Sequence, residues 1–504
     1  MRSKNAKLNI ISLVLLQAIT IICGFVVPKL IISRFGSDVN GLITSISQFL
    51  AYIILLESGF GPVVKSILYK PIAKEDKLTI EEILKSSESF FRKIALLFLV
   101  YILLLSIILP QILSNEFNSV FTLSLIIIIS ISTFTEYYFG MTYKLYLEAR
   151  QKTYIISIIQ IGIIILNTIV IIVLIKLGAS IQIIKLATAL IFVLRPVLQN
   201  IYVRKKYNIN LNNAKGNFRI EQKWDGLAQH IAYVINNNTD VVILTLCSNT
   251  LEVSVYYVYA LITNNIKNII CSFIAGVNDS LGDMIAKDEN IGLNKNFKII
   301  EELYFAISTI VFSATLFLIL PFVNLYMNGV VDVNYIRKIF AIIMILGRFV
   351  WTIRYPYEEL TKTAGHFKQT QKGAWFEAIC NVTISLALAW KYGVIGVAIG
   401  TLISMVIRTI EFMYHTSKYI LKRSIWYTFK RLIIIAIEFI VILLIMNIIP
   451  HIEIKGYITW IVQAIIVSII SIAVTITINS MIYKENIKSI IEKLKKMVSG
   501  DGVF

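Results

Sequence analysis

The chain has 504 residues, of which 57% are hydrophobic, and its mean hydropathy is +0.76. Soluble domains are about 45–50% apolar, so a protein of this composition has too little polar surface to stay dissolved without lipid around it. The formal net charge is +18, although only 15% of the residues are charged. A strongly basic soluble protein would suggest a nucleic-acid partner, but the positions of these charges favour a different explanation, given below.

The cysteines and histidines form no recognisable metal or redox motif. The four cysteines are never spaced as CxxC, and the four histidines are scattered without the spacing of metal ligands. The nucleotide-binding and zinc-protease motifs GxGxxG, GKS/T and HExxH are also missing from the sequence. We therefore expect no metal, no cofactor and no enzymatic activity.

Apolar runs long enough to cross a membrane follow one another along the chain. A spanning helix needs about 20 mostly apolar residues. The N-terminal run continues past Cys23 without a small-residue cleavage site, so we interpret it as a retained first helix. Gly59, Gly61 and Pro62 predict a bend or break in the second span. The fold class is therefore an all-α integral membrane protein with about fourteen transmembrane helices, at residues 9–33, 38–66, 91–113, 117–143, 153–175, 179–203, 225–247, 251–280, 299–322, 335–360, 373–390, 394–416, 429–450 and 456–483.

Lysine and arginine gather on one side of these spans. With the N-terminus inside, the inner connections hold most of the basic residues, as in 70–93 and 204–223. Since basic loops stay in the cytoplasm, we predict a multi-pass protein of the bacterial inner membrane with both termini cytoplasmic. The tail at 484–504 reads as a basic amphipathic helix lying on the anionic inner leaflet. The outer connections hold only Arg34, Lys176, Lys391 and Lys455, with Arg337 and Lys338 at a helix start.

The first and second halves of the chain share matches in the same order. Leu42–Thr44 matches Leu261–Thr263 at an offset of 219, and Arg195 matches Arg408 at an offset of 213. Such matches predict a duplicated set of six spans, with chance similarity between apolar helices as the alternative. Six is even, so the two bundles would be related by an axis along the membrane normal and could rock against each other. The predicted parts are a six-helix bundle at 1–206, a second at 207–424, two extra helices at 425–483 and the tail at 484–504.

Ionisable side chains inside the spans are costly in lipid, so each should face a wet cavity or a partner. By residue count, Lys267, Arg348 and Arg408 lie nearest the middle of the membrane. Some charges should pair internally, because Arg408 and Glu411 are one helical turn apart, as are Arg354 and Glu358. The seventh and eighth spans are also rich in asparagine. Such amides suit a hydrated cavity that binds sugar hydroxyls or a phosphate, with helix–helix hydrogen bonds as the alternative.

Two stretches near the N-terminus carry a family resemblance. Residues 34–42, RFGSDVNGL, and 56–61, LESGFG, resemble the opening of bacterial polysaccharide flippases, which move O-antigen and capsule-type lipid-linked oligosaccharides. These flippases belong to the multidrug/oligosaccharidyl-lipid/polysaccharide exporter superfamily. The resemblance implies two bundles around a cationic lumen and an undecaprenyl-pyrophosphate-linked oligosaccharide moved from the inner to the outer leaflet by alternating access. Its alternatives are a lipid II flippase or a multidrug exporter of the same superfamily and, from another class, a membrane-embedded polysaccharide polymerase.

The intramembrane cations suit a pyrophosphate, because guanidinium and ammonium groups are the usual partners of phosphate oxygens. The alternative is that Lys267 and Arg348 are locked to internal carboxylates such as Asp240 or Glu57. Expected partners are the lipid-linked oligosaccharide and membrane lipids, with a polysaccharide polymerase or another assembly component as a candidate and no nucleic acid. The predicted substrate-binding residues are Lys267, Arg348, Arg354, Arg408, Lys29, Asn237, Asn264 and Asp240, and the candidates for ion coupling are Glu57, Asp240 and Glu358.

The charge asymmetry makes a topology prediction. In a cysteine-free background, Lys215→Cys should resist a membrane-impermeant thiol reagent in intact cells and react after the cells are opened. Lys391→Cys, in a predicted outer connection, should react in both conditions and serves as the control. Labelling of the residue-215 variant in intact cells would disprove the orientation.

Overall fold

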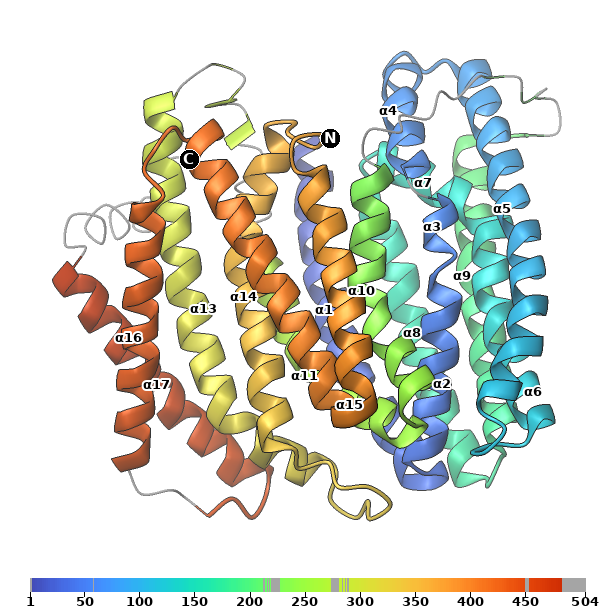
Figure 1. Cartoon of the computed structure of the whole chain (residues 1–504). Coiled ribbons are helices and arrows are strands. Elements are labelled where there is room, and N and C mark those ends of the chain that lie inside the picture. The colour runs from blue at the N-terminus through green and yellow to red at the C-terminus, as the bar shows by residue number, and fades with distance from the viewer. Residues whose placement is uncertain are drawn as a thin grey trace. The chain divides into compact units, whose positions relative to one another are not determined.

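The computed structural model describes residues 2–57, 59–211, 214, 216, 218, 227–272, 281–282, 284–285, 287, 290–448 and 453–482. These residues form helices joined by short connections, with no strand among them (Figure 1). Eleven helices in this part of the chain are long and apolar enough to cross a membrane. The chain divides into two compact units, Met1–Tyr257 and Val258–Phe504, and each unit is described by itself. The bundles predicted at 1–206 and 207–424, and the side on which the termini lie, stay predictions.

Unit 1 is built from long apolar helices with short breaks between them. The longest, α5, begins fourteen residues before the span predicted at 91–113, because Ile80, Ile83 and Leu84 are fully or almost fully buried on one face of its charged first turns. Asp76 caps this helix by accepting the Thr79 N–H at 3.1 Å, and hydrogen bonds from Thr79 lower the pKa of that carboxyl. The elements are α1 (Arg2–Phe35), α2 (Ser37–Ala51), α3 (Ile54–Glu57), α4 (Phe60–Ala73), α5 (Lys77–Ile112), α6 (Ser119–Thr135), the π-helical turn η1 (Glu136–Gly140), α7 (Met141–Ala149), α8 (Thr153–Lys176), α9 (Ile181–Tyr207), α10 (Leu227–Cys247) and the start of α11 (Thr250–Ser272).

In the part that the structure describes, unit 2 includes the rest of α11 and the helices α13 to α17. One of them, α15, contains two predicted spans, because Gly393 leaves helical geometry with φ 53° and ψ −129°. The seventh and eighth predicted spans correspond to α10 and α11, so each of the fourteen predicted spans has a helical counterpart. Residues 273–280, at the end of the eighth predicted span, and the tail at 484–504 lie outside the described residues. The elements are α13 (Asn290–Tyr326), α14 (Lys338–Thr363), α15 (Gln371–His415), the π-helical turn η3 (Thr416–Ile420), α16 (Trp426–Ile448) and α17 (Tyr457–Ile482).

The predicted break in the second span is confirmed. The span is divided into α2, α3 and α4, and Gly59 has left-handed backbone angles just before α4. Pro62 lies in the first turn of α4, where the missing N–H costs nothing because first-turn N–H groups have no intrahelical partner. The break before α4 therefore lies at the glycine, and the proline is accommodated by the new helix.

The stretch RFGSDVNGL forms a tight turn and a close helix contact. Gly36, with φ 95°, separates α1 from α2 and supplies a backbone conformation that other residues rarely adopt. Gly41 lies directly against the backbone of Thr250 at the start of α11, where a Cβ atom would overlap the carbonyl group. Beside this contact, Asn40 donates a hydrogen bond to Ser254 at 2.8 Å. The stretch thus sets the path of the chain between two spans and holds α2 against α11.

This contact gives a stability prediction. Gly41→Ala should lower the free energy of unfolding by about 1–3 kcal/mol, the usual cost of overpacking, because the added methyl group meets backbone rather than a movable side chain. The control is Gly162→Ala within α8, where nothing lies within 4 Å of the added atom. The control should be neutral or stabilising by about 1 kcal/mol, since alanine favours a helix over glycine. Thermal unfolding in detergent checks both, and equal effects would contradict the close packing.

Candidate functional site

A chain of alternating charges is buried between α14 and α15 in unit 2. Arg354 Nη1 lies 2.7 Å from Glu377 Oε1, and Arg354 Nε lies 3.2 Å from Glu358 Oε2. The second oxygen of Glu377 lies 3.6 Å from Arg408 Nε. The Arg354, Glu377 and Arg408 side chains are only 3%, 9% and 4% exposed. Glu377, in the first half of α15, therefore joins an arginine of α14 to an arginine in the second half of α15.

Further partners occupy both ends of this chain. Lys362 Nζ lies 2.9 Å from the other oxygen of Glu358. Arg408 Nη1 lies 2.6 Å from Glu411 and donates a hydrogen bond to the backbone oxygen of Thr370 at 2.9 Å. The two pairs predicted one turn apart, Arg354 with Glu358 and Arg408 with Glu411, are thus confirmed. Because each buried charge has a partner of opposite sign, the cost of removing it from water is offset.

Two cations beside this chain lack a carboxylate partner among the described residues. Arg348, six residues before Arg354 on α14, is 8% exposed, and its buried Nε has no hydrogen-bond partner. Lys267 of α11 places its Nζ 4.3 Å from the centre of the Trp351 ring, and Arg354 Cζ lies 5.7 Å from the same ring. Lys267 is also within electrostatic range of Arg348 and Arg354, which have the same sign of charge, and of Glu358, which already pairs with Arg354 and Lys362. A ring face attracts a cation but carries no net charge, so neither Lys267 nor Arg348 has a carboxylate of its own among the described residues.

The arrangement is suited to holding an anion. Arg354 and Arg408 are occupied by carboxylates, whereas Arg348 and Lys267 have donors free of any carboxylate in the described part of the chain. A guanidinium beside an ammonium, in surroundings poorer in water than bulk solvent, matches the spread charge of a phosphate or pyrophosphate. Of the four predicted cations in unit 2, Arg354 and Arg408 are thus paired with carboxylates, whereas Lys267 and Arg348 are not paired with a described carboxylate.

The carboxylates considered as locks for these cations have other partners, within unit 1. Asp240 of α10 accepts a hydrogen bond from the Tyr256 hydroxyl at 2.7 Å. Glu57 of α3 accepts one from the Tyr137 hydroxyl at 3.0 Å. Both carboxylates are thus held by tyrosine hydroxyls, and their predicted part in ion coupling stays a prediction.

The remaining predicted residues are spread over both units. Asn264 is half-buried on α11, three residues before Lys267 and hence on a neighbouring part of the helix surface. Lys29 is half-buried within α1 of unit 1. The Asn237 side chain lies outside the described residues, although its backbone belongs to α10. Only Asn264 among these lies close along the chain to the cations of unit 2.

A cavity of about 390 Å³ with a buried ion pair in its wall lies beside the π-helical turn of unit 1. The turn directs Glu136 toward Arg195 of α9, with 2.8 Å between Glu136 Oε2 and Arg195 Nη2, and both side chains line the cavity. Its next residue, Tyr137, also lines the cavity and donates to Glu57. Single π-helical turns are frequent at functional sites. Glu136, Tyr137 and Arg195 were not predicted to belong to a site, although the match of Arg195 with Arg408 was a usable signal, since both arginines pair with buried glutamates.

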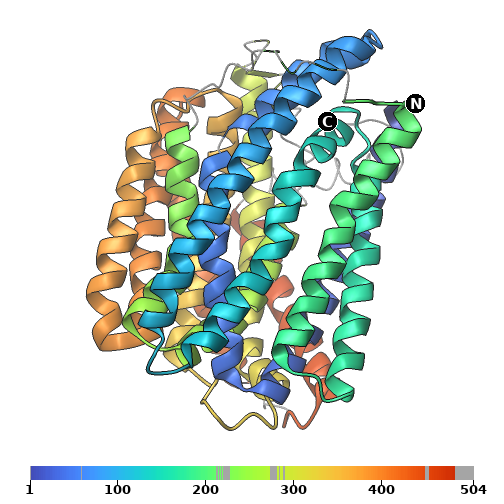
Figure 2. The same ribbon diagram turned by 90° about the vertical axis from the view of Figure 1, so that its right-hand side faces the viewer.

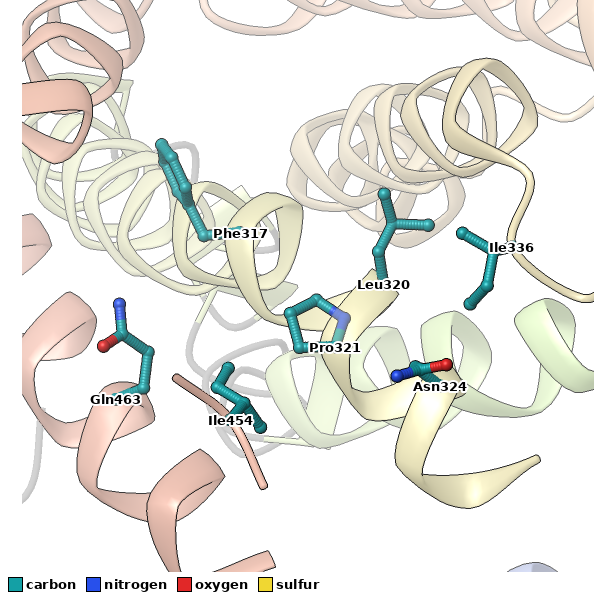
Figure 3. A pocket seen from close by; sticks show the side chains of 7 residues that line it. All are labelled: Phe317, Leu320, Pro321, Asn324, Ile336, Ile454 and Gln463. Atoms are coloured by element: carbon teal, nitrogen blue, oxygen red, sulfur yellow. The ribbon is translucent and has the colours of Figure 1, made fainter. Parts of the chain in front are cut away.

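Another cavity, in unit 2, has no charged side chain among its described lining residues. It encloses about 590 Å³ beside Pro321 of α13, and the amides of Asn324 and Gln463 are its only polar groups among the described lining residues (Figure 3). Without a charged side chain, these residues offer no counterpart to an anionic group. The cavity is lined by Phe317, Leu320, Pro321, Asn324, Ile336, Ile454 and Gln463.

Comparison with known proteins identifies the fold. No protein-family model and no curated protein matches the chain. Among solved structures, the lipid II flippase MurJ in an inward closed conformation is 17% identical, with 95% of this chain and 99% of that chain covered and a TM-score of 0.70. A mutant of the Vibrio cholerae MATE transporter VcmN is 14% identical, with 84% and 99% covered and a TM-score of 0.58. An inward-facing multidrug resistance MATE family transporter of the MOP superfamily is 15% identical, with 79% and 94% covered and a TM-score of 0.56. The chain therefore has the helical fold of the MurJ and MATE transporters.

The charge pairing predicts that two substitutions in the site differ in their effect on stability. Glu377→Gln should lower the free energy of unfolding by about 3–5 kcal/mol, because it leaves Arg354 and Arg408 buried without this shared partner. Arg348→Met should change it by no more than about 1 kcal/mol or stabilise the protein, because no described carboxylate loses a partner. Unfolding in detergent micelles by denaturant or heat checks both variants. A larger loss in Arg348→Met than in Glu377→Gln would contradict the assignment of paired and unpaired cations.

Proposed function

We propose that the chain flips an undecaprenyl-pyrophosphate-linked oligosaccharide from the inner to the outer leaflet of the cytoplasmic membrane, by alternating access, for surface polysaccharide biosynthesis. The observation that carries the proposal is the pair Arg348 and Lys267, two cations in unit 2 with no described carboxylate partner. Cations without a carboxylate partner inside a membrane-spanning fold cost free energy unless an anion binds to them. The fold shared with the MurJ and MATE transporters makes transport the fitting activity.

In this proposal the pyrophosphate sits between Arg348 and Lys267. Arg348 contributes directional N–H donors and Lys267 a compact charge, so both phosphates find a partner. In unit 2, Asn264 is proposed to bind sugar hydroxyls. In unit 1, Asn237, Asp240 and Lys29 stay proposed substrate-binding residues.

The paired arginines have a different role in the proposal. Arg354 and Arg408 keep α14 and both halves of α15 together through Glu377 while the protein changes conformation. Glu358 shares Arg354 with Glu377 and is therefore a candidate for ion coupling, because protonation or cation binding there would change the partners of Arg354. The proposed direction of transport also fits the membrane potential, which is worth about 2.3 kcal/mol per elementary charge per 100 mV for an anion leaving a negative interior.

Lipid II is a second candidate substrate. The observation in its favour is the likeness to the lipid II flippase MurJ over 95% of this chain with a TM-score of 0.70.

An exporter of cationic drugs is disfavoured, because Arg348 and Lys267 would repel an organic cation. A polysaccharide polymerase or another assembly component remains the proposed protein partner.

The test is transport by a double variant, Lys267→Ala with Arg348→Ala. Purified protein is reconstituted in vesicles, and the movement of labelled undecaprenyl-pyrophosphate oligosaccharide between leaflets is measured. We expect the rate to fall at least about tenfold, since each lost charged hydrogen bond is worth about 1.5–3 kcal/mol. Substituting lipid II in the same assay separates the two candidate substrates.

The matched control also removes two cations, through Lys418→Ala with Lys430→Ala, because both lysines are exposed in unit 2. Control and double variant should insert at equal levels and elute as single species, and the control should transport normally. Unchanged transport by the well-folded double variant would reject the proposed site, whereas loss of folded double variant would assign the two cations a structural role.

A further inference from the structure

An apolar groove of about 700 Å³ lies in unit 1, between the beginning of α8 and the end of α9. The two helices pack side by side and run in opposite directions (Figure 2). Ile158 of α8 and Leu198 and Ile201 of α9 line the groove, and all three side chains are exposed. Since both helices are long and apolar enough to cross a membrane, such a surface is stable only where hydrocarbon covers it.

The groove ends in a cluster of cations. Lys205 and Lys206, in the last turn of α9, line its end. Nearby, Arg150 Cζ and Lys152 Nζ lie 4.4 Å and 5.2 Å from the centre of the Tyr207 ring. Within the described part of the chain none of the four cations forms an ion pair, because the adjacent carboxylate, Glu148, is bound to Lys65 at 3.0 Å. The cluster therefore presents uncompensated positive charge where the apolar groove stops.

The start of α8 adds positive potential at the same end. Asn9 of α1 accepts the Tyr154 N–H at 2.8 Å and donates to the Gln151 carbonyl at 3.1 Å, which fixes the turn leading into α8. The first N–H groups of a helix carry a partial positive charge that favours a nearby anion. Tyr154 also lines the groove, so the helix terminus and the lysine pair act on the same region.

We propose that this groove binds an anionic diacyl phospholipid of the surrounding bilayer. The headgroup phosphate lies against Lys205 and Lys206, and the acyl chains follow the apolar walls formed by α8 and α9. The apolar lining favours a lipid over a free anion, and the four uncompensated cations favour an anionic over a zwitterionic headgroup. This site belongs to unit 1 and does not depend on the proposed transport substrate.

Native mass spectrometry of the full-length protein with defined lipids tests the proposal. The probes are phosphatidylglycerol and phosphatidylcholine with identical acyl chains. We expect the wild-type protein to retain phosphatidylglycerol preferentially. In the double variant Lys205→Gln with Lys206→Gln, the apparent affinity for phosphatidylglycerol should fall about ten- to thirtyfold, because two charges near the headgroup are removed.

The control variant, Lys70→Gln with Lys74→Gln, removes the same charge from exposed lysines of unit 1 that do not line the groove. It should retain phosphatidylglycerol like the wild type. Ile158→Trp keeps every cation but fills the groove, so it should weaken binding of the same lipid. The lysine control tests whether the position of the removed charge matters, and Ile158→Trp tests whether the shape of the groove matters.

Three results would overturn the proposal. If the Lys70/Lys74 variant lost as much apparent affinity for phosphatidylglycerol as the Lys205/Lys206 variant, net charge alone would attract the lipid. Equal retention of phosphatidylcholine would mean that the headgroup is not recognised. Displacement of the lipid by glycerol phosphate, which has no acyl chains, together with normal binding by Ile158→Trp, would identify a site for a free anion. Each variant is compared after size-exclusion chromatography shows a single folded species.

Discussion

The double ion pair of Glu377 with Arg354 and Arg408 is the constraint on which the site in unit 2 depends. A carboxylate this deeply buried is tolerated only with partners, and so are the two arginines. Sliding α14 by one turn along α15 would therefore break the Arg354–Glu377 pair, which is the ion pair of this set that joins the two helices. Because the available carboxylates are used in this way, Arg348 and Lys267 are left without one among the described residues. The structural pairing and the proposed anion site are two results of the same arrangement.

The sequence predicted the order of the helices because long apolar runs are a one-dimensional signal. It misjudged where helices end. The first turns of α5 look like a charged connection in a hydropathy window, but Ile80, Ile83 and Leu84 pack on one face and extend the helix to Lys77. The predicted span at 117–143 contains the π-helical turn η1, which no apolar run reveals. Such features depend on packing between helices, which the sequence alone does not display.

For the candidate site, the sequence predicted the charged residues and their local pairs but not the contacts between distant residues. Lys267, Arg348, Arg354 and Arg408 stood out because ionisable groups are rare in apolar spans. The pairs Arg354–Glu358 and Arg408–Glu411 could be predicted because they are local. The bridge through Glu377 spans 23 residues to Arg354 and requires two helices to meet, and the contact of Lys267 with Trp351 has the same origin. Local pairing can be deduced from spacing, whereas choice among distant partners is a property of the tertiary fold.

The π-helical turn at Glu136–Gly140 has a consequence for how this span can change through evolution. A π-helical turn contains one residue more than the α-helical turn it replaces, and one residue corresponds to a rotation of about 100° around an α-helix. Loss of a single codon there would return the turn to α-helical geometry and rotate α7 relative to α6. Glu148, which reaches Lys65, and Tyr143, which accepts hydrogen bonds from Arg204, would then face other neighbours. The span is thus sensitive to its length at one position, and single-residue insertions and deletions there would redirect whole helix faces.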